Sequence, residues 1–124
     1  ALPADAVAGL DDGTLLRLCR ALLPHGTVVV TLGAAGCFAS LPGDNDAQGP
    51  RWHRVAGERA TVVDTTGAGD AFNGALAASM ALDPAGGLLA QLRFAGRFAA
   101  LSTEREGAAT AMPTRADVAA RFGP

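Results

Sequence analysis

The sequence predicts an α/β fold in which a mainly parallel sheet is flanked by helices. Segments with apolar residues at helical spacing alternate along the chain with short β-branched runs. Hydrophobic residues make up 49% of the 124 residues and charged residues 18%, a balance that supports a packed core rather than disorder. Alternating strands and helices favour a sheet whose parallel strands are joined by helical crossovers. The length predicts a single domain.

The first part of the chain is predicted to form one helix and two strands. Ala1–Gly13 is small, acidic and interrupted by Gly and Pro, which indicates a loop or a weak helix. Over Thr14–Leu23 the apolar residues recur on one helical face. Thr27–Leu32 is a continuous β-branched run, typical of a strand covered on both faces. A turn then leads into a second strand over Cys37–Leu41 and a polar surface loop over Pro42–Pro50.

The second part is predicted to be mainly helical, after two short strands near Trp52–Val55 and Thr61–Val63. Its predicted helices and loop are, in order, Ala71–Leu82, about Ala85–Ser102, the loop Gly107–Pro113 and a last helix starting at Thr114. Ala and Gly dominate the first of these helices. Such small side chains allow close approach of helix axes, so we expect this helix to be tightly packed.

Charge and lysine usage exclude several classes of function. The chain has 10 Arg and no Lys against 12 acidic residues, which gives a formal net charge of −2. A nucleic-acid-binding domain would show a basic face or tail, and this sequence has neither. The absence of lysine excludes the Walker-type phosphate loop and Schiff-base chemistry, because both depend on a lysine amine.

Cysteine usage and the lack of apolar runs indicate the compartment. Cys19 and Cys37 lie in apolar segments, and two cysteines define no disulfide framework. We expect two buried free thiols, which suits a reducing compartment and a cytoplasmic protein. No apolar run approaches the roughly 18 residues that span a bilayer, and no secretory signal is present, so no membrane partner is expected. The sequence starts at Ala1 without Met, which leads us to expect a piece of a longer protein.

The stretch from Val62 to Asp70 is the most informative part of the sequence. A predicted strand ends in Asp64 and two threonines, a Gly-Ala-Gly turn follows, and a helix begins at once. Glycines let successive N–H groups point at one spot, and a helix N-terminus carries partial positive charge. This combination suits a transferring phosphoryl group, with Asp70 placed to accept a proton from an attacking hydroxyl. The alternative is a plain strand-to-helix turn in which Asp70 caps the helix.

Asp64–Leu76 closely resembles the C-terminal signature of the ribokinase-like sugar kinases, the phosphofructokinase-B family. Two further segments agree with that family in order and spacing. Val28–Gly36 resembles the strand and turn at its ATP site, and Arg93–Pro113 resembles its last nucleotide-side helix and cation loop. The resemblance covers about residues 14 to 122 and implies that residues 1–124 form the C-terminal, ATP-binding part of a ribokinase-like domain.

The resemblance implies roles for individual residues. Asp70 would be the catalytic base on the sugar hydroxyl and would contact the substrate. The anion hole for the transferring phosphate would consist of the backbone N–H groups of Gly67, Ala68 and Gly69. The residues that would line ATP, mainly through backbone groups, are Thr31, Leu32, Gly33, Ala34, Ala35 and Gly36, together with Gly69 and Asp70. Mg²⁺ would enter with the nucleotide.

The resemblance also implies a monovalent cation, K⁺, beside the anion hole. Its ligands would be mostly backbone carbonyls, at Asp64, Thr66, Ser102, Arg105, Gly107 and Ala111. Two positions depart from the family pattern. Gly96 stands where many members have Asn or His near the adenine, and Ala111 replaces a residue that is often a Ser ligand.

The function implied by the resemblance is ATP-dependent phosphoryl transfer to a sugar hydroxyl. The expected partners are ATP and a small sugar, with a homodimer through the β-lid. Ribose is favoured because the cation loop resembles that branch, and fructose, 2-keto-3-deoxygluconate or a nucleoside are the alternatives. The N-terminal half of the family, which carries the sugar-binding residues and the lid, has no counterpart in residues 1–124.

Two other interpretations remain open. The missing sugar-binding half supports a non-catalytic nucleotide-binding or structural fragment of such a kinase. A Rossmann oxidoreductase is less well supported, because the Gly-Ala-Gly turn comes late in the chain. In addition, no acidic residue ends a following strand about 20 residues further on.

Overall fold

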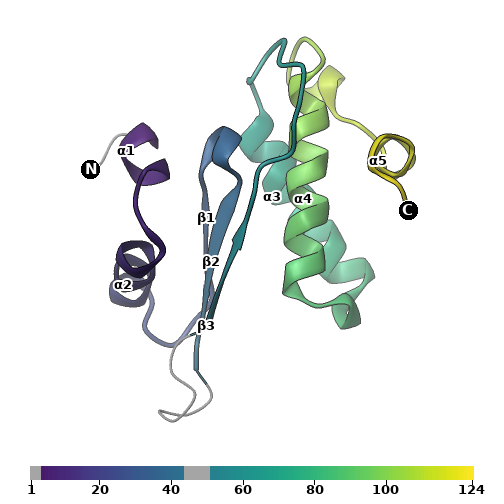
Figure 1. Ribbon diagram of the computed structural model, residues 1–124. Coiled ribbons are helices and arrows are strands. Elements are labelled where there is room, and N and C mark those ends of the chain that lie inside the picture. Colours follow the sequence, from purple (N-terminus) through teal and green to yellow (C-terminus); the bar gives the residue numbers. More distant parts are fainter. Residues whose placement is uncertain (1–3, 44–50) are drawn as a thin grey trace. The chain divides into compact units, whose positions relative to one another are not determined.

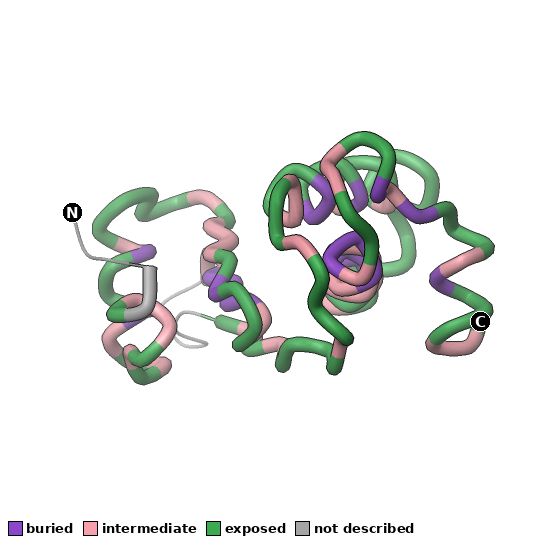
Figure 2. The backbone as a smooth tube through the Cα atoms, turned by 90° about the horizontal axis from the view of Figure 1, so that it is seen from above, coloured by how far each residue is buried: buried purple, intermediate pink, exposed green. Residues whose placement is uncertain are grey.

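The computed structural model describes residues 4–43 and 51–124 (Figure 1). The chain divides into two compact units, Ala1–Ala56 and Gly57–Pro124, which we call the N-terminal unit and the C-terminal unit. Each unit has its own buried positions, with exposed positions around them (Figure 2). None of the helices within the described ranges is long and apolar enough to cross a membrane.

The N-terminal unit contains an antiparallel sheet with strand order β1-β2-β3, together with two helices. Its elements are α1 (Ala4–Ala8), α2 (Asp12–Leu22), β1 (Val28–Thr31), a 3-10 turn (Gly33–Ala35), β2 (Cys37–Leu41) and β3 (Arg51–Val55). These positions confirm the predicted helix and three of the predicted strands to within about two residues. The predicted surface loop over Pro42–Pro50 lies mostly outside the described residues.

The prediction of a mainly parallel sheet is wrong for the described strands, which are all antiparallel. The reason is the connection between β1 and β2, which consists of Leu32–Gly36 alone. A turn this short can only join antiparallel strands, because a parallel pair needs a crossover of about a dozen residues or more. The helices of the C-terminal unit follow the three strands instead of alternating with them.

The core of the N-terminal unit forms between α2 and the sheet. Its fully buried cluster comprises Leu15 and Cys19 of α2, Leu32 after β1 and Phe38 of β2. Four of the five residues of β2 are buried, because β2 is the central strand with a neighbour on each side. The strand expected to be covered on both faces, β1, is instead only partly buried, since it lies at the edge of the described sheet.

The structure confirms that Cys19 and Cys37 are free and buried. Burial raises the pKa of both thiols, because an apolar environment disfavours the charged thiolate. Both cysteines therefore act as small hydrophobic residues in the core of the N-terminal unit.

The C-terminal unit is helical. It comprises α3 (Ala68–Leu82), a 3-10 turn (Pro84–Gly86), α4 (Leu88–Thr103), a second 3-10 turn (Ala109–Ala111) and α5 (Arg115–Phe122). The first helix begins three residues before the predicted Ala71. Helices α3 and α4 pack against each other, with Ala71, Phe72 and Ala75 of α3 and Leu92 and Ala95 of α4 among the buried residues (Figure 1). The Ala-rich helix thus contacts α4, and Ala71, Phe72 and Ala75 are its buried residues.

The strand predicted over Thr61–Val63 is absent from the structure. The backbone N–H groups of Val63 and Asp64 both donate to the carbonyl oxygen of Thr103, at 2.7 and 3.0 Å. The N–H of Thr61 donates to Oε2 of Glu104 at 2.8 Å. The backbone N–H groups of this segment therefore find their hydrogen-bond acceptors at the C-terminal end of α4 instead of in a sheet.

An aspartate side chain takes part in the N-terminal cap of two helices, one in each unit. At the start of α2, Oδ1 of Asp11 accepts a hydrogen bond from the N–H of Thr14 at 2.7 Å. At the start of α5, Oδ2 of Asp117 accepts from the N–H of Thr114 at 2.8 Å, and the Thr114 hydroxyl accepts from the N–H of Asp117. The bond from the Thr14 backbone lowers the pKa of Asp11, and the bond from the Thr114 backbone lowers the pKa of Asp117.

These lowered pKa values predict the direction of the pH dependence of stability. A carboxyl group whose pKa is lower in the folded state stabilises the fold above its unfolded pKa, and this contribution is lost as the pH falls through the folded pKa. We therefore expect the free energy of unfolding to be level near neutral pH and to decrease below about pH 4. Asp11→Asn keeps a capping oxygen but does not titrate. The free energy of unfolding of this variant should therefore decrease less at acidic pH than that of the native chain.

Urea denaturation at about pH 6 and about pH 3.5 measures this difference. Asp83→Asn is the matched control, because the Asp83 side chain makes no capping hydrogen bond. An acid-induced loss of stability as large in Asp11→Asn as in the native chain would contradict the prediction.

Candidate functional site

The turn before α3 places a helix N-terminus next to a loop of the same unit. Gly67 precedes the helix with a φ of +81°, in the left-handed region that favours glycine. The N–H of Ala68 donates to the carbonyl of Thr65 at 3.2 Å, which closes the turn. The N–H groups of Gly67 and Gly69 have no acceptor within the part of the chain that the structure describes. Free donors at a helix N-terminus can bind an anion.

Asp70 lies in the first turn of α3, and its side chain is exposed. The residue that precedes the helix is Gly67, and no side chain caps it, so the alternative in which Asp70 caps the helix is wrong. Its carboxylate makes no hydrogen bond or ion pair with another described residue. A carboxylate at this end of a helix is stabilised by the helix dipole and remains available to a ligand.

Asp64 connects the turn to the loop that follows α4. Its Oδ1 accepts from the N–H of Thr66 at 2.9 Å, and its Oδ2 accepts from the N–H of Gly107 at 2.9 Å. These hydrogen bonds, first that from the Thr66 backbone, lower the pKa of Asp64. The carboxylate thus holds together two segments that lie far apart in the sequence.

The structure brings only part of the predicted cation set together. Asp64, Thr66 and Gly107 are joined by the hydrogen bonds just described. The Ser102 hydroxyl donates to the carbonyl of Ala99 at 2.7 Å within α4, and Arg105 pairs with Asp117 at 3.5 Å. The sixth predicted ligand, Ala111, is fully buried at the end of its 3-10 turn.

The donor chemistry around Asp64 is compatible with a monovalent cation. A carboxylate has about four lone-pair sites, and backbone N–H groups use two of them here. The described residues contain no group of three or more His, Cys, Asp or Glu side chains suited to a metal. A cation at this position would therefore depend on the remaining Asp64 lone pairs and on backbone carbonyls.

The predicted ATP-lining segment Thr31–Gly36 lies in the N-terminal unit, whereas Gly67–Asp70 lies in the C-terminal unit. Within its own unit the segment forms a tight turn: the N–H of Leu32 donates to the carbonyl of Gly36 at 2.8 Å. The Leu32 side chain is buried in the core, so only its backbone can contact a ligand. Thr31 and the 3-10 turn Gly33–Ala35 are exposed.

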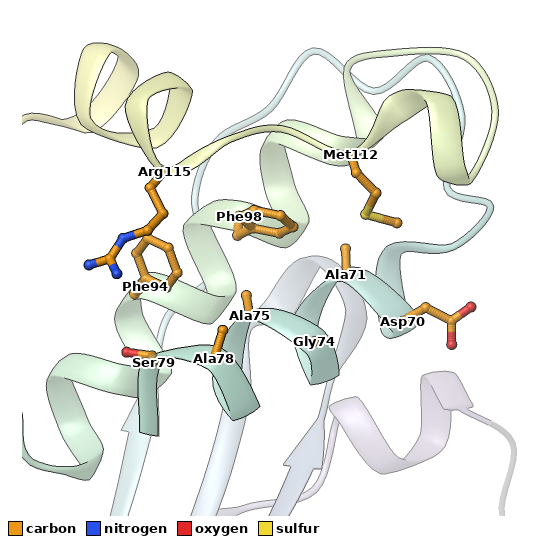
Figure 3. Close-up of a pocket in the computed structure, with 10 residues that line it drawn as sticks. All are labelled: Asp70, Ala71, Gly74, Ala75, Ala78, Ser79, Phe94, Phe98, Met112 and Arg115. Carbon is orange, nitrogen blue, oxygen red and sulfur yellow. The ribbon is translucent and has the colours of Figure 1, made fainter. Parts of the chain in front are cut away.

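A groove of about 230 Å³ lies between α3, α4 and the segment that leads into α5 (Figure 3). Asp70 stands at one end of it, and Phe94 and Arg115 stand at the other, with Phe98 and Met112 between them. The lining of this groove was not predicted from the sequence. The available signal was the spacing of Phe94 and Phe98, which places both rings on one face of α4.

Gly67→Ala is expected to destabilise the C-terminal unit by at least about 1–2 kcal/mol. A Cβ at this position would be forced into the left-handed region and would lie 3.0 Å from the Ala108 Cβ and 3.3 Å from its Cα. Chemical denaturation followed by far-UV circular dichroism measures the loss. Gly69→Ala is the matched control, since nothing lies within 4 Å of its Cβ and no positive φ is required there. Equal stability of Gly67→Ala and Gly69→Ala would refute the requirement for glycine at position 67.

Comparisons with known proteins agree on one family. The model of the pfkB family of carbohydrate kinases matches residues 4–115. Fructokinase-1 of Zea mays is 32% identical over 117 residues, which are 90% of this chain and 33% of that protein. Ribokinase of Mus musculus is 34% identical over 110 residues, which are 87% of this chain and 32% of that protein. The chain thus spans about a third of the length of these curated relatives.

Solved structures of sugar kinases have a similar fold. Ribokinase from Thermotoga maritima gives a TM-score of 0.72 at 27% identity, covering 94% of this chain and 38% of that chain. Fructokinase from Vibrio cholerae, solved with fructose, ADP and calcium, gives a TM-score of 0.71 at 31% identity, covering 94% of this chain and 37% of that chain. A double mutant of the latter was solved with fructose, ADP and potassium.

Proposed function

The chain belongs to the pfkB family of carbohydrate kinases, and from this we propose that it is the nucleotide-side, C-terminal part of an ATP-dependent sugar kinase. The observation that supports this most directly is the Asp70 carboxylate in the first turn of α3, next to the N–H groups of Gly67 and Gly69; among the described residues none of these groups has a partner. A proton acceptor and an anion-binding turn side by side are what phosphoryl transfer to a hydroxyl needs.

In the proposed reaction Asp70 accepts the proton of a sugar hydroxyl. The hydroxyl oxygen then forms a bond to the γ-phosphorus of ATP while the bond between that phosphorus and the bridging oxygen of ADP breaks. The N–H groups at the start of α3 donate to the phosphoryl oxygens, where negative charge develops. Mg²⁺ bound with the nucleotide would neutralise part of the phosphate charge. The role of the Gly67 turn is to hold these donors in place before the reaction begins.

Two further segments complete the proposed nucleotide side. The backbone groups of Thr31–Gly36 would contact ATP, as their exposed tight turn permits. K⁺ would bind at the Asp64 carboxylate and the carbonyls of the loop after α4, and would contribute fixed positive charge beside the turn. We propose that the sugar-binding residues belong to a part of the parent protein outside residues 1–124, with ribose as the first substrate to test and fructose as the second.

The share of the relatives that the chain covers favours a second candidate. Since residues 1–124 span about a third of each curated relative, the chain on its own could bind nucleotide without transferring phosphate. The two candidates differ in turnover: the kinase releases ADP in the presence of ATP and a sugar, whereas the fragment does not. The buried free thiols Cys19 and Cys37 fit a reducing, cytoplasmic location for either candidate.

Titration calorimetry of ATP into the 124-residue chain, with K⁺ or with a large organic cation in its place, tests the proposal. We expect binding in the micromolar to millimolar range that is tighter in K⁺. Asp64→Asn should remove the K⁺ dependence, while Asp83→Asn, at the other end of α3, should bind as the native chain does. An absence of ATP binding under both conditions would contradict a nucleotide site formed by this chain.

A further inference from the structure

A second groove, between α4 and α5, is lined by three arginines. Arg93, Arg97 and Arg115 line this groove of about 550 Å³, and no acidic side chain belongs to its lining. The chain as a whole has more acidic than basic residues, with a net charge of −2. Three cationic side chains in one groove are therefore a local concentration of charge that the composition does not predict.

Two of the three charges have no counter-ion within the described ranges. Arg97 donates through Nε to Oε1 of Glu58 at 3.2 Å. Arg93 and Arg115 form no ion pair with any described carboxylate. The groove therefore keeps about two uncompensated positive charges at neutral pH, because guanidinium groups do not lose their protons in proteins.

Aromatic rings hold two of the guanidinium groups without neutralising them. The Arg115 guanidinium lies 5.6 Å from the centre of the Phe94 ring (Figure 3), and that of Arg97 lies 5.4 Å from the centre of the Phe122 ring. A ring face attracts the cation but offers no hydrogen-bond acceptor in the ring plane. The N–H donors at the edges of the Arg115 guanidinium thus stay available to a ligand.

The arrangement costs stability in the empty state. Arg93 and Arg97 lie four residues apart on α4, where like charges repel each other. Arg115 is the first residue of α5, at the positive end of that helix dipole. The capping box between Thr114 and Asp117 fixes this position. A bound anion would relieve both of these unfavourable interactions, whereas no described carboxylate pairs with Arg93 or Arg115.

We propose that this groove binds a small polyanion that bears phosphate groups. Guanidinium groups match phosphate in shape and donate two parallel hydrogen bonds to it, and three of them along one groove favour a ligand with more than one anionic group. The lining of this groove contains neither Asp70 nor the Gly67 turn, and it shares only Phe94 and Arg115 with the groove at Asp70, so the inference concerns a different ligand position. It adds a second anion site to the C-terminal unit.

Binding of inorganic tripolyphosphate to the 124-residue chain at low ionic strength tests the inference. Removing two charge-assisted contacts in Arg93→Gln/Arg115→Gln should weaken binding roughly tenfold or more. Each single variant, Arg93→Gln and Arg115→Gln, is compared with Arg59→Gln, which removes one charge in the same unit outside the groove lining; Arg59→Gln should bind within about twofold of the native chain.

Each alternative result would overturn the inference. Equal weakening by Arg59→Gln would mean that tripolyphosphate responds only to net charge. Affinity kept in full by the double variant would place the ligand outside this groove. Citrate binding as tightly as tripolyphosphate would contradict a preference for phosphate. Thermal melts of the double variant exclude unfolding as the cause; its melting temperature should be no lower than that of the native chain, because both arginines are exposed and their removal relieves repulsion.

Discussion

Asp70→Asn is expected to lower the rate of ATP-dependent sugar phosphorylation by about 10²- to 10⁴-fold in the parent kinase. The asparagine amide has nearly the shape of the carboxylate but cannot accept the proton of the sugar hydroxyl at neutral pH. The carboxylate makes no hydrogen bond or ion pair with a described residue, so the substitution breaks no contact within them. The free energy of unfolding should therefore change by less than about 0.5 kcal/mol.

A steady-state assay of ADP release with ribose or fructose measures the effect, and titration calorimetry checks that ATP still binds. Asp83→Asn is the matched control, since it removes the same charge at the other end of α3. A loss confined to kcat supports the role of a base. Turnover of Asp70→Asn equal to that of the native enzyme would refute the assignment.

Phe38→Ala is expected to destabilise the N-terminal unit by about 3–5 kcal/mol. Phe38 is fully buried in β2, the central strand of the described sheet. Its ring stacks on Trp52 at 5.7 Å between centroids, and the Arg54 guanidinium lies over it at 5.8 Å. Removing the ring leaves a cavity and also removes the aromatic pair. A unit of this size has a total stability of only about 3–8 kcal/mol, so most of it would be lost.

Emission of Trp52 reports this change directly, because the chain has one Trp and no Tyr. The native chain should show a cooperative urea transition, and Phe38→Ala should show a transition at much lower urea or none. Leu22→Ala is the control in the same unit: its side chain is 77% exposed, and its effect should be within about 0.5 kcal/mol. A midpoint for Phe38→Ala close to that of Leu22→Ala would contradict the packing described for β2.

Much of the secondary structure could be predicted, because local patterns determine it. Apolar residues at helical spacing identified α2, and Thr114 was predicted as the start of the last helix, where the structure shows the capping box of α5. Strand direction depends instead on the length of a connection and on which strands are neighbours. The five residues of Leu32–Gly36 already exclude a parallel β1–β2 pair. The alternation of strand and helix patterns along the sequence favours a parallel sheet only where the connections between strands are long.

In the candidate site, too, local features could be predicted from the sequence, whereas contacts between distant segments could not. The turn from Gly67 to Asp70 was predictable, because glycine and a helix start leave a mark in the sequence. The bridge from Asp64 to Gly107 joins residues 43 positions apart, and only the fold brings them together. Likewise, the positions of Arg93 and Arg115 in one groove follow from the packing of α5 on α4, which no local pattern encodes.

The location of the two cysteines allows opening of the N-terminal unit to be measured by thiol labelling. Both thiols are buried in the N-terminal unit, and the C-terminal unit has none. A thiol reagent can modify Cys19 only when the N-terminal unit opens, because Cys19 lies in the core cluster of that unit. The rate of Cys19 modification at neutral pH follows the population of that open form when closing is fast. Opening of the helical unit alone leaves the Cys19 signal unchanged. Labelling kinetics compared with helix-sensitive circular dichroism would thus show whether the two units open together or one at a time.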